Sequence, residues 1–423
     1  MAGACFTAFS IAKFWKEHFN AQTPTSTLEM PLTDTSKRSL DLHRAQRGKI
    51  EVSLKVPLDN VDDLGLAYTP GVAAVSEAIQ KDPGALRDLT ITGNAVAVVT
   101  DGSAVLGLGD IGPAAAMPVM EGKAALLKKL ANVDGWPICL DASEPDDIVA
   151  AVRAIAPGFA GINLEDISAP RCFEIEDRLQ DLGIPVMHDD QHGTAIVLLA
   201  GLINAAKVTG KELADLKIVI AGAGAAGRAI VRLLRCIGQS DHLCEAVREV
   251  IVCDSKGALH RGRNDLDPVK EAILEYSNFE NKTGSVNEVL SGADVFIGVS
   301  QGGLLSADDI RTMAPDPIVF ALANPVPEIL PEEALAGGAA VVATGRSDYP
   351  NQVNNVLAFP GIFRGAIDAR AARIDEAMKL AAAEAIAACI ESPTAERILP
   401  DALDLNTAQA VANAVARTAT ANA

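Results

Sequence analysis

Short apolar runs alternate with amphipathic stretches along this 423-residue chain, and polar residues follow each apolar run. In the first half, four runs have the length and residue types of buried strands. They are residues 95–100, 137–141, 161–164 and 184–187. Between the last two, Arg171 to Leu182 is predicted to be a helix, because its apolar residues recur at helical spacing. Strands that alternate with helices predict an α/β fold built on parallel sheets.

The second half of the chain repeats this alternation and ends in helices. The apolar runs that predict its buried strands are residues 217–221, 249–253, 293–299, 317–322 and 339–344. The stretch from Ala195 to Lys207 predicts a long apolar helix that leads from one domain into the next. A chain of this length exceeds one ordinary core, so we expect two domains.

Residues 1–35 differ from the rest, because aromatic residues crowd into them and are followed by Thr, Pro and Ser. They lack the apolar core and cleavage site of a secretory signal and the arginines of a transit peptide. We expect a poorly ordered extension upstream of a natural start at Met30; a short helix that docks on a partner is the alternative. An α/β domain follows at 36–194, a dinucleotide-binding domain at 195–365 and C-terminal helices at 366–423.

Composition narrows the class of protein. A formal net charge of −19 argues against nucleic acid or an anionic membrane as the partner. The longest uncharged run, residues 191–206, is shorter than the roughly 18 apolar residues of a membrane span. The seven cysteines are scattered and form no Cys-x-x-Cys pair, so we expect reduced thiols and a cytoplasmic protein.

A glycine-rich turn follows the predicted strand at 217–221 and opens a predicted helix at 228–237. Its sequence, Gly222-Ala223-Gly224-Ala225-Ala226-Gly227, is the G-x-G-x-x-G fingerprint in its required strand–turn–helix setting. The first glycine permits the tight turn, the second lets the backbone approach a pyrophosphate, and the third lets the helix pack on the strand. We expect NAD or NADP to bind here with its phosphates at the helix N-terminus.

The predicted strand at 249–253 ends at Asp254, a position from which an acidic side chain accepts hydrogen bonds from the ribose hydroxyls of NAD. Ser255 and Lys256 follow directly and could instead hold the 2′-phosphate of NADP, which we slightly favour. Asp254 lies farther from the glycines than the usual roughly 20 residues, so we expect an excursion over residues 239–247.

Acidic residues follow two neighbouring predicted strands of the first domain. Asn163-Leu164-Glu165-Asp166 ends one strand, and His188-Asp189-Asp190-Gln191-His192 ends the next. A strand–helix–strand crossover places both ends at the same edge of a parallel sheet. Four carboxylates there would repel one another without a cation, and hard oxygen ligands favour Mg²⁺ or Mn²⁺. The alternative is that these acids cap helices. We expect the two histidines to form hydrogen bonds around the site rather than to bind zinc.

Eight short motifs occur in order along residues 36–423. They are Leu66-Ala-Tyr-Thr-Pro-Gly-Val72, Thr100-Asp-Gly-Ser103, Gly107-Leu-Gly-Asp110, Met120-Glu-Gly-Lys123, Asn163-Leu-Glu-Asp166, His188-Asp-Asp-Gln-His-Gly-Thr194, Ala323-Asn-Pro325 and Asn354-Asn-Val-Leu357. As a set they resemble the malic enzymes of the short bacterial type. The resemblance implies divalent-metal-dependent oxidative decarboxylation of (S)-malate to pyruvate and CO₂ with reduction of NAD or NADP, and decarboxylation of oxaloacetate as a further activity. We also expect a homodimer or a larger homo-oligomer.

The resemblance also implies roles for single residues. Lys123 would be the base that takes the proton of the C2 hydroxyl, Asp189 would orient it, and Tyr68 would be the acid that protonates C3. The metal ligands would be Glu165, Asp166 and Asp190. The amides on the substrate and nicotinamide side would be Asn324, Asn354 and Asn355.

Ala104 departs from the long eukaryotic-type members of that family, which carry at this position an arginine that grips the malate carboxylate. Another two-domain dehydrogenase, such as an amino-acid dehydrogenase, would share the fold but has no use for a carboxylate metal site. A non-catalytic dinucleotide-binding protein would keep the glycine-rich turn without Tyr68, Lys123 and Glu165. Dependence of malate turnover on Mn²⁺ discriminates among the three.

Overall fold

The computed structural model describes residues 34–105, 107–237 and 246–421. The chain divides into two compact units, Met1–Gly48 and Lys49–Ala423. The described part of the first unit contains helix α2 (Asp34–Gln46), none of whose residues is buried. Residues 1–33 of the expected extension, and residues 239–245 of the expected excursion, lie outside the described residues.

Short helices open the second unit. They are α3 (Val61–Ala67), α4 (Val72–Lys81), η1 (Pro83–Ala85), α5 (Leu86–Leu89) and η2 (Ile91–Asn94). Neither α3 nor α4 buries a residue. Thr69 followed by Pro70 is typical of an N-cap and the first residue of a helix, which predicts a helix from Pro70. In the structure α4 begins at Val72 with Gly71 in the N-cap position. The backbone at Tyr68–Gly71 is instead used in a turn that joins α3 to α4.

The first sheet has four parallel strands in the order β2-β1-β3-β4. They are β1 (Ala95–Thr100), β2 (Asp134–Cys139), β3 (Gly161–Leu164) and β4 (Val186–His188). Side chains of β1 alternate between two cores, as the pleat of a strand requires. Val96 and Val98 share one core with α6 (Gly112–Ala131). Ala97 and Val99 share the other with α7 (Pro145–Ile155), which η3 (Ala156–Gly158) follows, and with α8 (Arg171–Leu179).

The sequence predicts a helix only over Ala124–Leu130, after a glycine-dense stretch that is typical of a loop, but helix α6 is longer. It starts at Gly112 and runs through Pro118 to Ala131. The density of glycine and proline in residues 107–123 favours a loop. Packing nevertheless stabilises the helix, because one of its faces is buried along its whole length. The buried residues are Ala116, Met120, Lys123, Ala124, Leu127 and Leu130.

The second sheet has six strands in the order β10-β9-β8-β5-β6-β7, all parallel except β7. The strands are β5 (Lys217–Ala221), β6 (Glu249–Asp254), β7 (Gly257–Ala258), β8 (Val295–Gly298), β9 (Ile318–Ala321) and β10 (Val341–Thr344). The associated helices are η4 (Leu213–Asp215), α10 (Ala225–Leu234), α11 (Pro268–Leu274), α12 (Val286–Val289), α13 (Ala307–Ile310) and α14 (Pro331–Ala336). Every strand predicted from the apolar runs of this half is present.

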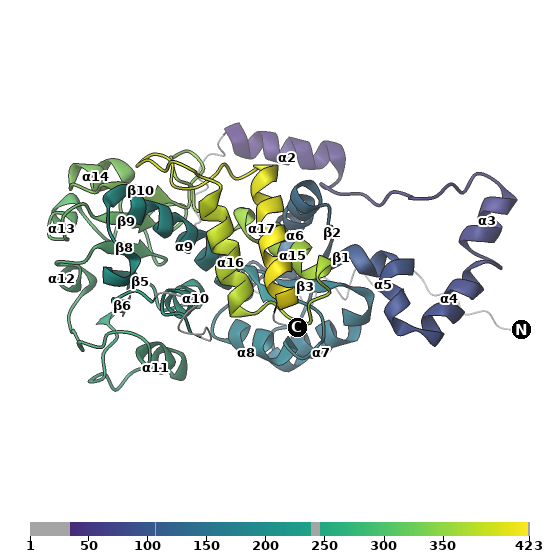
Figure 1. Ribbon diagram of the computed structural model, residues 1–423, viewed down its shortest axis with the longest axis horizontal. Helices are drawn as coiled ribbons and strands as arrows, with labels where there is room; N and C mark the ends of the chain where they lie inside the picture. Colours follow the sequence, from purple (N-terminus) through teal and green to yellow (C-terminus); the bar gives the residue numbers. More distant parts are fainter. Residues whose placement is uncertain (1–33, 106, 238–245, 422–423) are drawn as a thin grey trace, which may run out of the picture. The chain divides into compact units, whose positions relative to one another are not determined.

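Helix α9 (Asp189–Thr209) joins the two sheets and begins directly after β4, earlier than the expected helix from Ala195. It packs on α10 and on the C-terminal helix α16 (Glu376–Ala388). Helices α15 (Phe359–Asp368), preceded by η5 (Asn355–Leu357), and α17 (Leu405–Ala421) complete this layer. Figure 1 draws α15, α16 and α17 in yellow-green to yellow and α9 and α10 in teal. By length and composition α9 could cross a membrane, but 67% of its most apolar window is buried inside the protein.

The described cysteines differ in their chemical state. Cys139, Cys172, Cys253 and Cys389 are free, whereas Cys236 is disulfide-bonded. The expectation of reduced thiols throughout is therefore wrong for Cys236. The predicted cytoplasmic location, which relied on reduced thiols, loses part of its support.

Asn204 provides a test of how α9 is held. Its side chain is fully buried and donates hydrogen bonds to the carbonyls of Ala387 and Ile398, each at 2.9 Å. We expect Asn204→Ala to lower the free energy of unfolding by roughly 2–4 kcal/mol, because two buried carbonyls lose their donor. Urea denaturation measures this. Asn413→Ala, on the exposed side of α17, should change the same quantity by less than about 0.5 kcal/mol; equal losses in the two variants would contradict the prediction.

Candidate active site and metal centre

The acidic pairs meet because β3 and β4 are neighbours in the first sheet. The two strands are parallel, and Leu164 lies opposite His188 in their register. Glu165 and Asp166 follow the first of these residues, and Asp189 and Asp190 follow the second. The sheet therefore delivers four carboxylates to one edge, and the second pair forms the first turn of α9. Acidic residues in a first helical turn are also favoured by the helix dipole.

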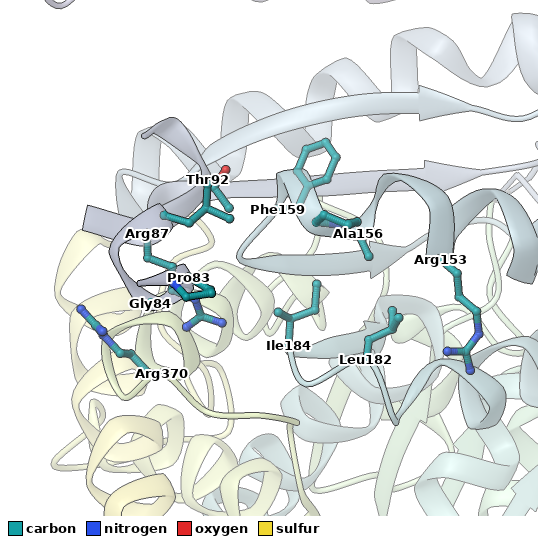
Figure 2. Close-up of a pocket in the computed structure, with 12 residues that line it drawn as sticks. Pro83, Gly84, Arg87, Thr92, Arg153, Ala156, Phe159, Leu182, Ile184 and Arg370 are labelled. Carbon is teal, nitrogen blue, oxygen red and sulfur yellow. The ribbon is translucent and has the colours of Figure 1, made fainter. Parts of the chain in front are cut away.

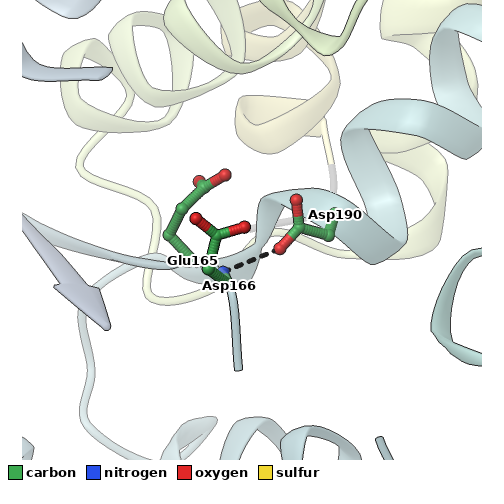
Figure 3. Close-up of side chains that lie close together, drawn as sticks. All are labelled: Glu165, Asp166 and Asp190. Carbon is green, nitrogen blue, oxygen red and sulfur yellow. Dashed lines mark hydrogen bonds between the residues drawn. The ribbon is translucent and has the colours of Figure 1, made fainter. Parts of the chain in front are cut away.

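Three of these carboxylates form a compact cluster, which Figure 3 shows converging on one point. Glu165, Asp166 and Asp190 each offer an oxygen, and these oxygens lie within 4.8 Å of one another. The backbone N–H of Asp166 donates to Asp190 Oδ2 at 2.8 Å, and Asn163 donates to Glu165 Oε2 at 2.9 Å. Asp166 has a φ of 53°, a left-handed conformation that is uncommon outside glycine and asparagine. The spacing is close enough for one cation to be shared.

Lys123 reaches this cluster from α6 and is 9% exposed. Its Nζ lies 3.0 Å from Glu165 Oε1, forms a second ion pair with Asp189 Oδ2, and stands 4.6 Å from the centre of the Phe359 ring. Burial alone would lower the pKa of Lys123, but the carboxylates of Asp189, Glu165 and Asp190 raise it above its ordinary value. Because Lys123 is buried, it is not a solvated surface lysine.

Burial also changes the acids beside Lys123. It raises the pKa of Asp189 to about 6 even though Lys123 opposes the change. Burial, opposed by Lys123, together with the charges of Asp190 and Asp189 raises the pKa of Glu165 well above its ordinary value. Four carboxylates around one ammonium group leave an excess of negative charge at this edge of the sheet.

The residues present fit a divalent cation. Besides the three clustered carboxylates, Asp189 Oδ1 and both ring nitrogens of His188 are buried without a hydrogen-bond partner in the described part of the chain. Such polar atoms are costly unless something satisfies them. Carboxylate oxygens are the ligands of Mg²⁺ and Mn²⁺ rather than of zinc. Glu165, Asp166 and Asp190 would hold such an ion.

Glu176, on α8, is a functional candidate that the sequence pattern did not reveal. Its carboxylate accepts hydrogen bonds from the backbone N–H of His188 at 2.9 Å, from Gln191 at 3.3 Å and from the ring of His192 at 3.0 Å. Burial raises its pKa, but His192 and Lys379 outweigh burial and lower it to about 2. Glu176 thus fixes the junction of β4 and α9. The sequence feature that could have revealed Glu176 is an acidic residue next to Ile175 on an otherwise apolar helix face.

The hydrogen bond to Glu176 confirms the expected role of His192. His188 does not behave as expected, because neither of its ring nitrogens forms a hydrogen bond, although Nδ1 lies 3.8 Å from Asp190 Oδ2.

Gly193, one turn into α9, has a positional reason to lack a side chain. A Cβ there would lie 2.0 Å from Asp189 Oδ1, so any larger residue would displace the carboxylate that holds Lys123.

A cavity of about 450 Å³ lies next to the carboxylate cluster and is lined by residues from both sheets. Asp166, His188 and Asp190 lie on one side of it, and Ala225 and Ala226 of the glycine-rich turn on another. The expected amides Asn324, Asn354 and Asn355 also line it, as do Ala104 and Gly107. Residues as far apart in the sequence as Ala104 and Asn355 thereby line one cavity. Asn351 is not among the residues that line this cavity. It is a turn residue with a φ of 57°, and its side chain forms hydrogen bonds with three backbone groups.

A larger cavity, of about 770 Å³, lies over the glycine-rich turn and extends to Asp254, Ser255 and Lys256. Gly222 has a φ of 126°, and a Cβ there would lie 2.6 Å from the carbonyl of Val299. A Cβ on Gly227 would lie 2.0 Å from the carbonyl of Gly222. Gly224 faces open space, as a backbone that receives a pyrophosphate must. The turn has the geometry of a dinucleotide site.

Asp254 does not stand free to accept ribose hydroxyls, contrary to expectation. Arg263 donates to both of its oxygens at 2.8 and 2.9 Å, Lys256 donates its backbone N–H at 2.9 Å, and Lys270 Nζ lies 3.1 Å from Oδ2. Burial raises the pKa of Asp254, but Arg263 in particular outweighs it and lowers the pKa to about 2. A carboxylate has about four acceptor positions, and these four donors fill them.

Glu328 is a second buried acid that the sequence pattern did not reveal. It is fully buried and accepts hydrogen bonds from the backbone N–H of Ser300 at 2.8 Å and of Ala323 at 3.0 Å. It therefore ties together the loops after β8 and β9, both of which line the cavity beside the carboxylates. A Cβ on Gly298 would overlap its carboxyl group. The sequence signal was weak, since Glu328 lies in a proline-rich loop that reads as solvent-exposed.

Tyr68 is the one predicted catalytic residue that the structure does not bring to the site. It is 66% exposed and does not line the cavity. It lies between α3 and α4, which Figure 1 shows apart from the four-stranded sheet of their own unit. The nearest described candidates for a proton donor inside the cavity are the carboxyl groups and His188.

Another cavity, drawn in Figure 2, lies at the opposite end of the first sheet, near the starts of β3 and β4. Its floor is apolar, with Phe159, Leu182 and Ile184, and arginines stand around it. Two of these are already engaged: Arg153 with Asp181 at 2.6 Å and Arg370 with Asp88 at 2.8 Å. Among the described residues, no acidic or amide side chain lines this cavity, so the carboxylate edge remains the candidate active site.

Comparison with known proteins agrees with this geometry. Residues 47–180 match the family model "Malic enzyme, N-terminal domain", and residues 191–420 match "Malic enzyme, NAD binding domain". The chain is 53% identical to the bifunctional malic/malolactic enzyme of Bacillus subtilis, over 90% of this chain and 92% of that protein. It is 50% identical to an NADP-dependent malic enzyme of Rhizobium meliloti, over 84% of this chain and 46% of that protein. The crystal structure of the NAD-dependent malic enzyme of Thermotoga maritima is similar with a TM-score of 0.85 and 48% identity, over 89% of this chain and 98% of that one. The chain therefore belongs to the malic enzyme family.

Proposed function

We propose that this protein catalyses the oxidative decarboxylation of malate to pyruvate and CO₂ with reduction of a nicotinamide cofactor. One observation carries the proposal: Asp166 and Asp190 line the same cavity as the glycine-rich turn and three amides, and Glu165, which clusters with these two acids, pairs with Lys123. Malate presents a hydroxyl and two carboxylates, which a base, a cation and amide donors recognise.

The reaction needs a base, a hydride acceptor, a Lewis acid and a proton donor. A divalent cation supplies Lewis-acid chemistry when bound, polarising the C2 oxygen and stabilising the negative charge that develops as CO₂ leaves. The glycine-rich turn would hold the nicotinamide cofactor, which would supply the hydride acceptor for C2. Lys123 takes the proton of the C2 hydroxyl, and Asp189 holds its amine in place. The resemblance to the family assigns the return of a proton to C3 to Tyr68, which in this structure is 66% exposed and lies outside the cavity.

Lys123 acts as a base only if its amine loses its proton. The surrounding carboxylates raise its pKa, so the amine is protonated while their charge is unopposed. Positive charge bound by Glu165 and Asp190 would cancel that attraction and leave burial, which lowers the pKa of Lys123. The same carboxylates thus link metal binding to activation of the base. Asn324, Asn354 and Asn355 would orient the substrate carboxylates, in place of the arginine that Ala104 lacks.

NADP is the cofactor that we propose. Asp254 has its four acceptor positions filled by Arg263, Lys256 and Lys270, so it offers no acceptor to the ribose hydroxyls of NAD. Ser255 and Lys256 line the cavity directly after it. Lys256 is held by Asp265 at 2.6 Å at an exposed position, from which its ammonium group can turn to a 2′-phosphate.

The rival functions are less compatible with this geometry. An amino-acid dehydrogenase has no need for three carboxylates within reach of one cation. A non-catalytic dinucleotide-binding protein has no need for a lysine buried among carboxylates, because burying these charges costs stability.

The metal site predicts a loss of both binding and activity when a ligand is changed. Glu165→Gln should weaken Mn²⁺ binding at least about 10-fold, because it removes one negative ligand from the cluster. Isothermal titration calorimetry of the protein with Mn²⁺ alone measures this, and chelation of metal should abolish malate turnover. Asp147→Asn, an exposed acid in the first turn of α7, is the matched control and should leave both unchanged. Unchanged Mn²⁺ affinity in Glu165→Gln would refute the site.

The acid and base predict separable defects. Lys123→Ala should lower hydride transfer by about 10²–10⁴-fold, because it removes the base that takes the C2 proton. Tyr68→Phe should lose pyruvate formation from malate yet retain reduction of oxaloacetate, because the hydride step does not use the C3 proton. Cofactor absorbance and a pyruvate assay report the two steps. Full pyruvate formation by Tyr68→Phe would show that Tyr68 is not the acid.

Cofactor choice is tested at Lys256. Wild type should give a higher kcat/KM with NADP than with NAD, and Lys256→Ala should lower kcat/KM for NADP about 10-fold or more while leaving NAD nearly unchanged. The reason is the loss of a charged hydrogen bond to the 2′-phosphate. Lys282→Ala, in the same domain and outside the cavity, controls for general effects of lost charge. Equal losses with the two cofactors would contradict the assignment.

A further inference from the structure

The cavity drawn in Figure 2 has the size of a small-molecule site, yet it takes no part in the proposed function. Its volume of about 450 Å³ lies within the range of roughly 300–1,000 Å³ that is usual for such sites. Its walls come from three regions far apart in the sequence, near residues 83–92, 153–159 and 182–184, and from Arg370. All of them belong to one compact unit, Lys49–Ala423. The cavity is therefore a feature of the tertiary fold rather than of a single loop.

The floor of this cavity consists of apolar side chains that the core covers only in part. Phe159, Leu182 and Ile184 pack against the core of the first sheet, but each is only half-buried and also lines the cavity. Phe159 follows η3, and the other two belong to the loop that leads into β4. Apolar surface in a concave place is favourable for binding a ligand with an apolar body, because both surfaces then leave water.

Three arginines give this cavity a positive rim. In Figure 2, Arg87 and Arg370 lie on one side of the apolar side chains, and Arg153 lies on the other. Since no acidic side chain of the described residues is part of the lining, the lining carries positive charge. The whole chain has a formal net charge of −19, so the rim is a local exception. A positive rim around an apolar floor attracts an anion that has an apolar body.

Arg87 differs from the other two arginines because its guanidinium group has no partner. Within the part of the chain that the structure describes, it forms no hydrogen bond and no ion pair, although the residue is half-buried. Arg153 is paired with Asp181, and Arg370 is paired with Asp88. These four residues are exposed, and exposed ion pairs of this kind contribute little to stability. The donors of Arg87 are therefore the ones that are available to a ligand.

The backbone that carries Arg87 is held close to the next element of the chain. A Cβ on Gly93, in η2, would lie 2.0 Å from the carbonyl oxygen of Arg87, so α5 and η2 pack closely only because residue 93 is glycine. At the end of α5 the hydroxyl group of Thr90 donates to the carbonyl of Leu86 at 2.7 Å. The position of Arg87 at the rim is thus set before any ligand binds, which lowers the entropy cost of binding.

We propose that this cavity binds an organic acid whose apolar body carries one carboxylate. The apolar body would cover Phe159, Leu182 and Ile184, and the carboxylate would accept hydrogen bonds from Arg87. A guanidinium group presents two parallel N–H donors that match the two oxygens of a carboxylate. One unpaired guanidinium group suits one carboxylate. A nucleotide would need further donors for its phosphate and its sugar, and no amide side chain of the described residues lines the cavity.

Titration with a simple acid tests this site. 4-Phenylbutyrate has an apolar body and one carboxylate, and a ligand-observed NMR titration of the full chain should give a Kd of about 1 mM or tighter. 4-Phenylbutyramide lacks the charge and acetate lacks the apolar body, so each should bind at least about 10-fold more weakly. Failure of 4-phenylbutyrate to saturate the protein, or equal binding of the amide, would overturn the proposal.

Substitution of Arg87 locates the bound acid. Arg87→Ala should raise the Kd of 4-phenylbutyrate about 10-fold or more, because the charged hydrogen bonds to the carboxylate are lost. Its urea midpoint should stay at the wild-type value, since Arg87 has no partner to lose among the described residues. Arg417→Ala is the matched control, at an exposed arginine of α17 outside the cavity, and should leave the Kd unchanged. An unchanged Kd in Arg87→Ala would contradict the assignment.

Competition separates this cavity from the candidate active site, where a carboxylate could also bind. Saturating malate with Mn²⁺ should leave the Kd of 4-phenylbutyrate unchanged, because the two cavities share no lining residue. Displacement by malate would place the acid at the active site and refute a separate site. Inorganic phosphate at the concentration of the acid should not displace it either, and displacement would show a phosphate site instead. These titrations measure binding without turnover, so their outcome does not depend on the proposed function.

Discussion

The crowding of like charges at the ends of β3 and β4 is the constraint on which the rest of the site depends. The parallel register of two short strands brings four carboxylates to one edge, where burial makes their repulsion costly. Lys123 offsets part of this charge, and a divalent cation would offset the rest. Stability and chemistry are therefore linked here, because the groups that would bind a cation are also those that raise the pKa of Lys123.

Two buried acids outside the cluster hold this arrangement in place. Glu176 fixes the junction between β4 and α9, where Asp189 and Asp190 begin the helix. Glu328 ties together the loops after β8 and β9, and both loops line the same cavity. Both accept backbone N–H groups at strand ends, so the strands of the two sheets are held where their polar ends can act together.

Apolar surface is distributed unequally between residues 50–72 and the rest of the second unit. The two sheets and α9 bury their apolar side chains almost completely, and Gly201 of α9 lets the helix approach the Phe320 ring of β9 closely. Residues 50–72 keep a strand-like apolar face and a tyrosine exposed to water.

Local sequence patterns determined much of this protein. Apolar runs located nearly all the strands, the glycine spacing located the dinucleotide turn, and the ordered motifs pointed to the family and to Glu165, Asp166, Asp190 and Lys123. These signals are readable because strand alternation, turn glycines and acids at strand ends depend on neighbouring residues.

Only the tertiary structure decided what depends on distant neighbours. The start of α6 at Gly112 follows from burial of one helix face, against the local preference of its glycines and prolines. The saturation of Asp254 by Arg263 and Lys270, the positioning by Glu176 and Glu328, and the absence of Tyr68 from its own cavity all arise from contacts, or missing contacts, between segments far apart along the chain. Charge and hydrogen-bond partners are properties of a place in space, so no stretch of sequence could show them.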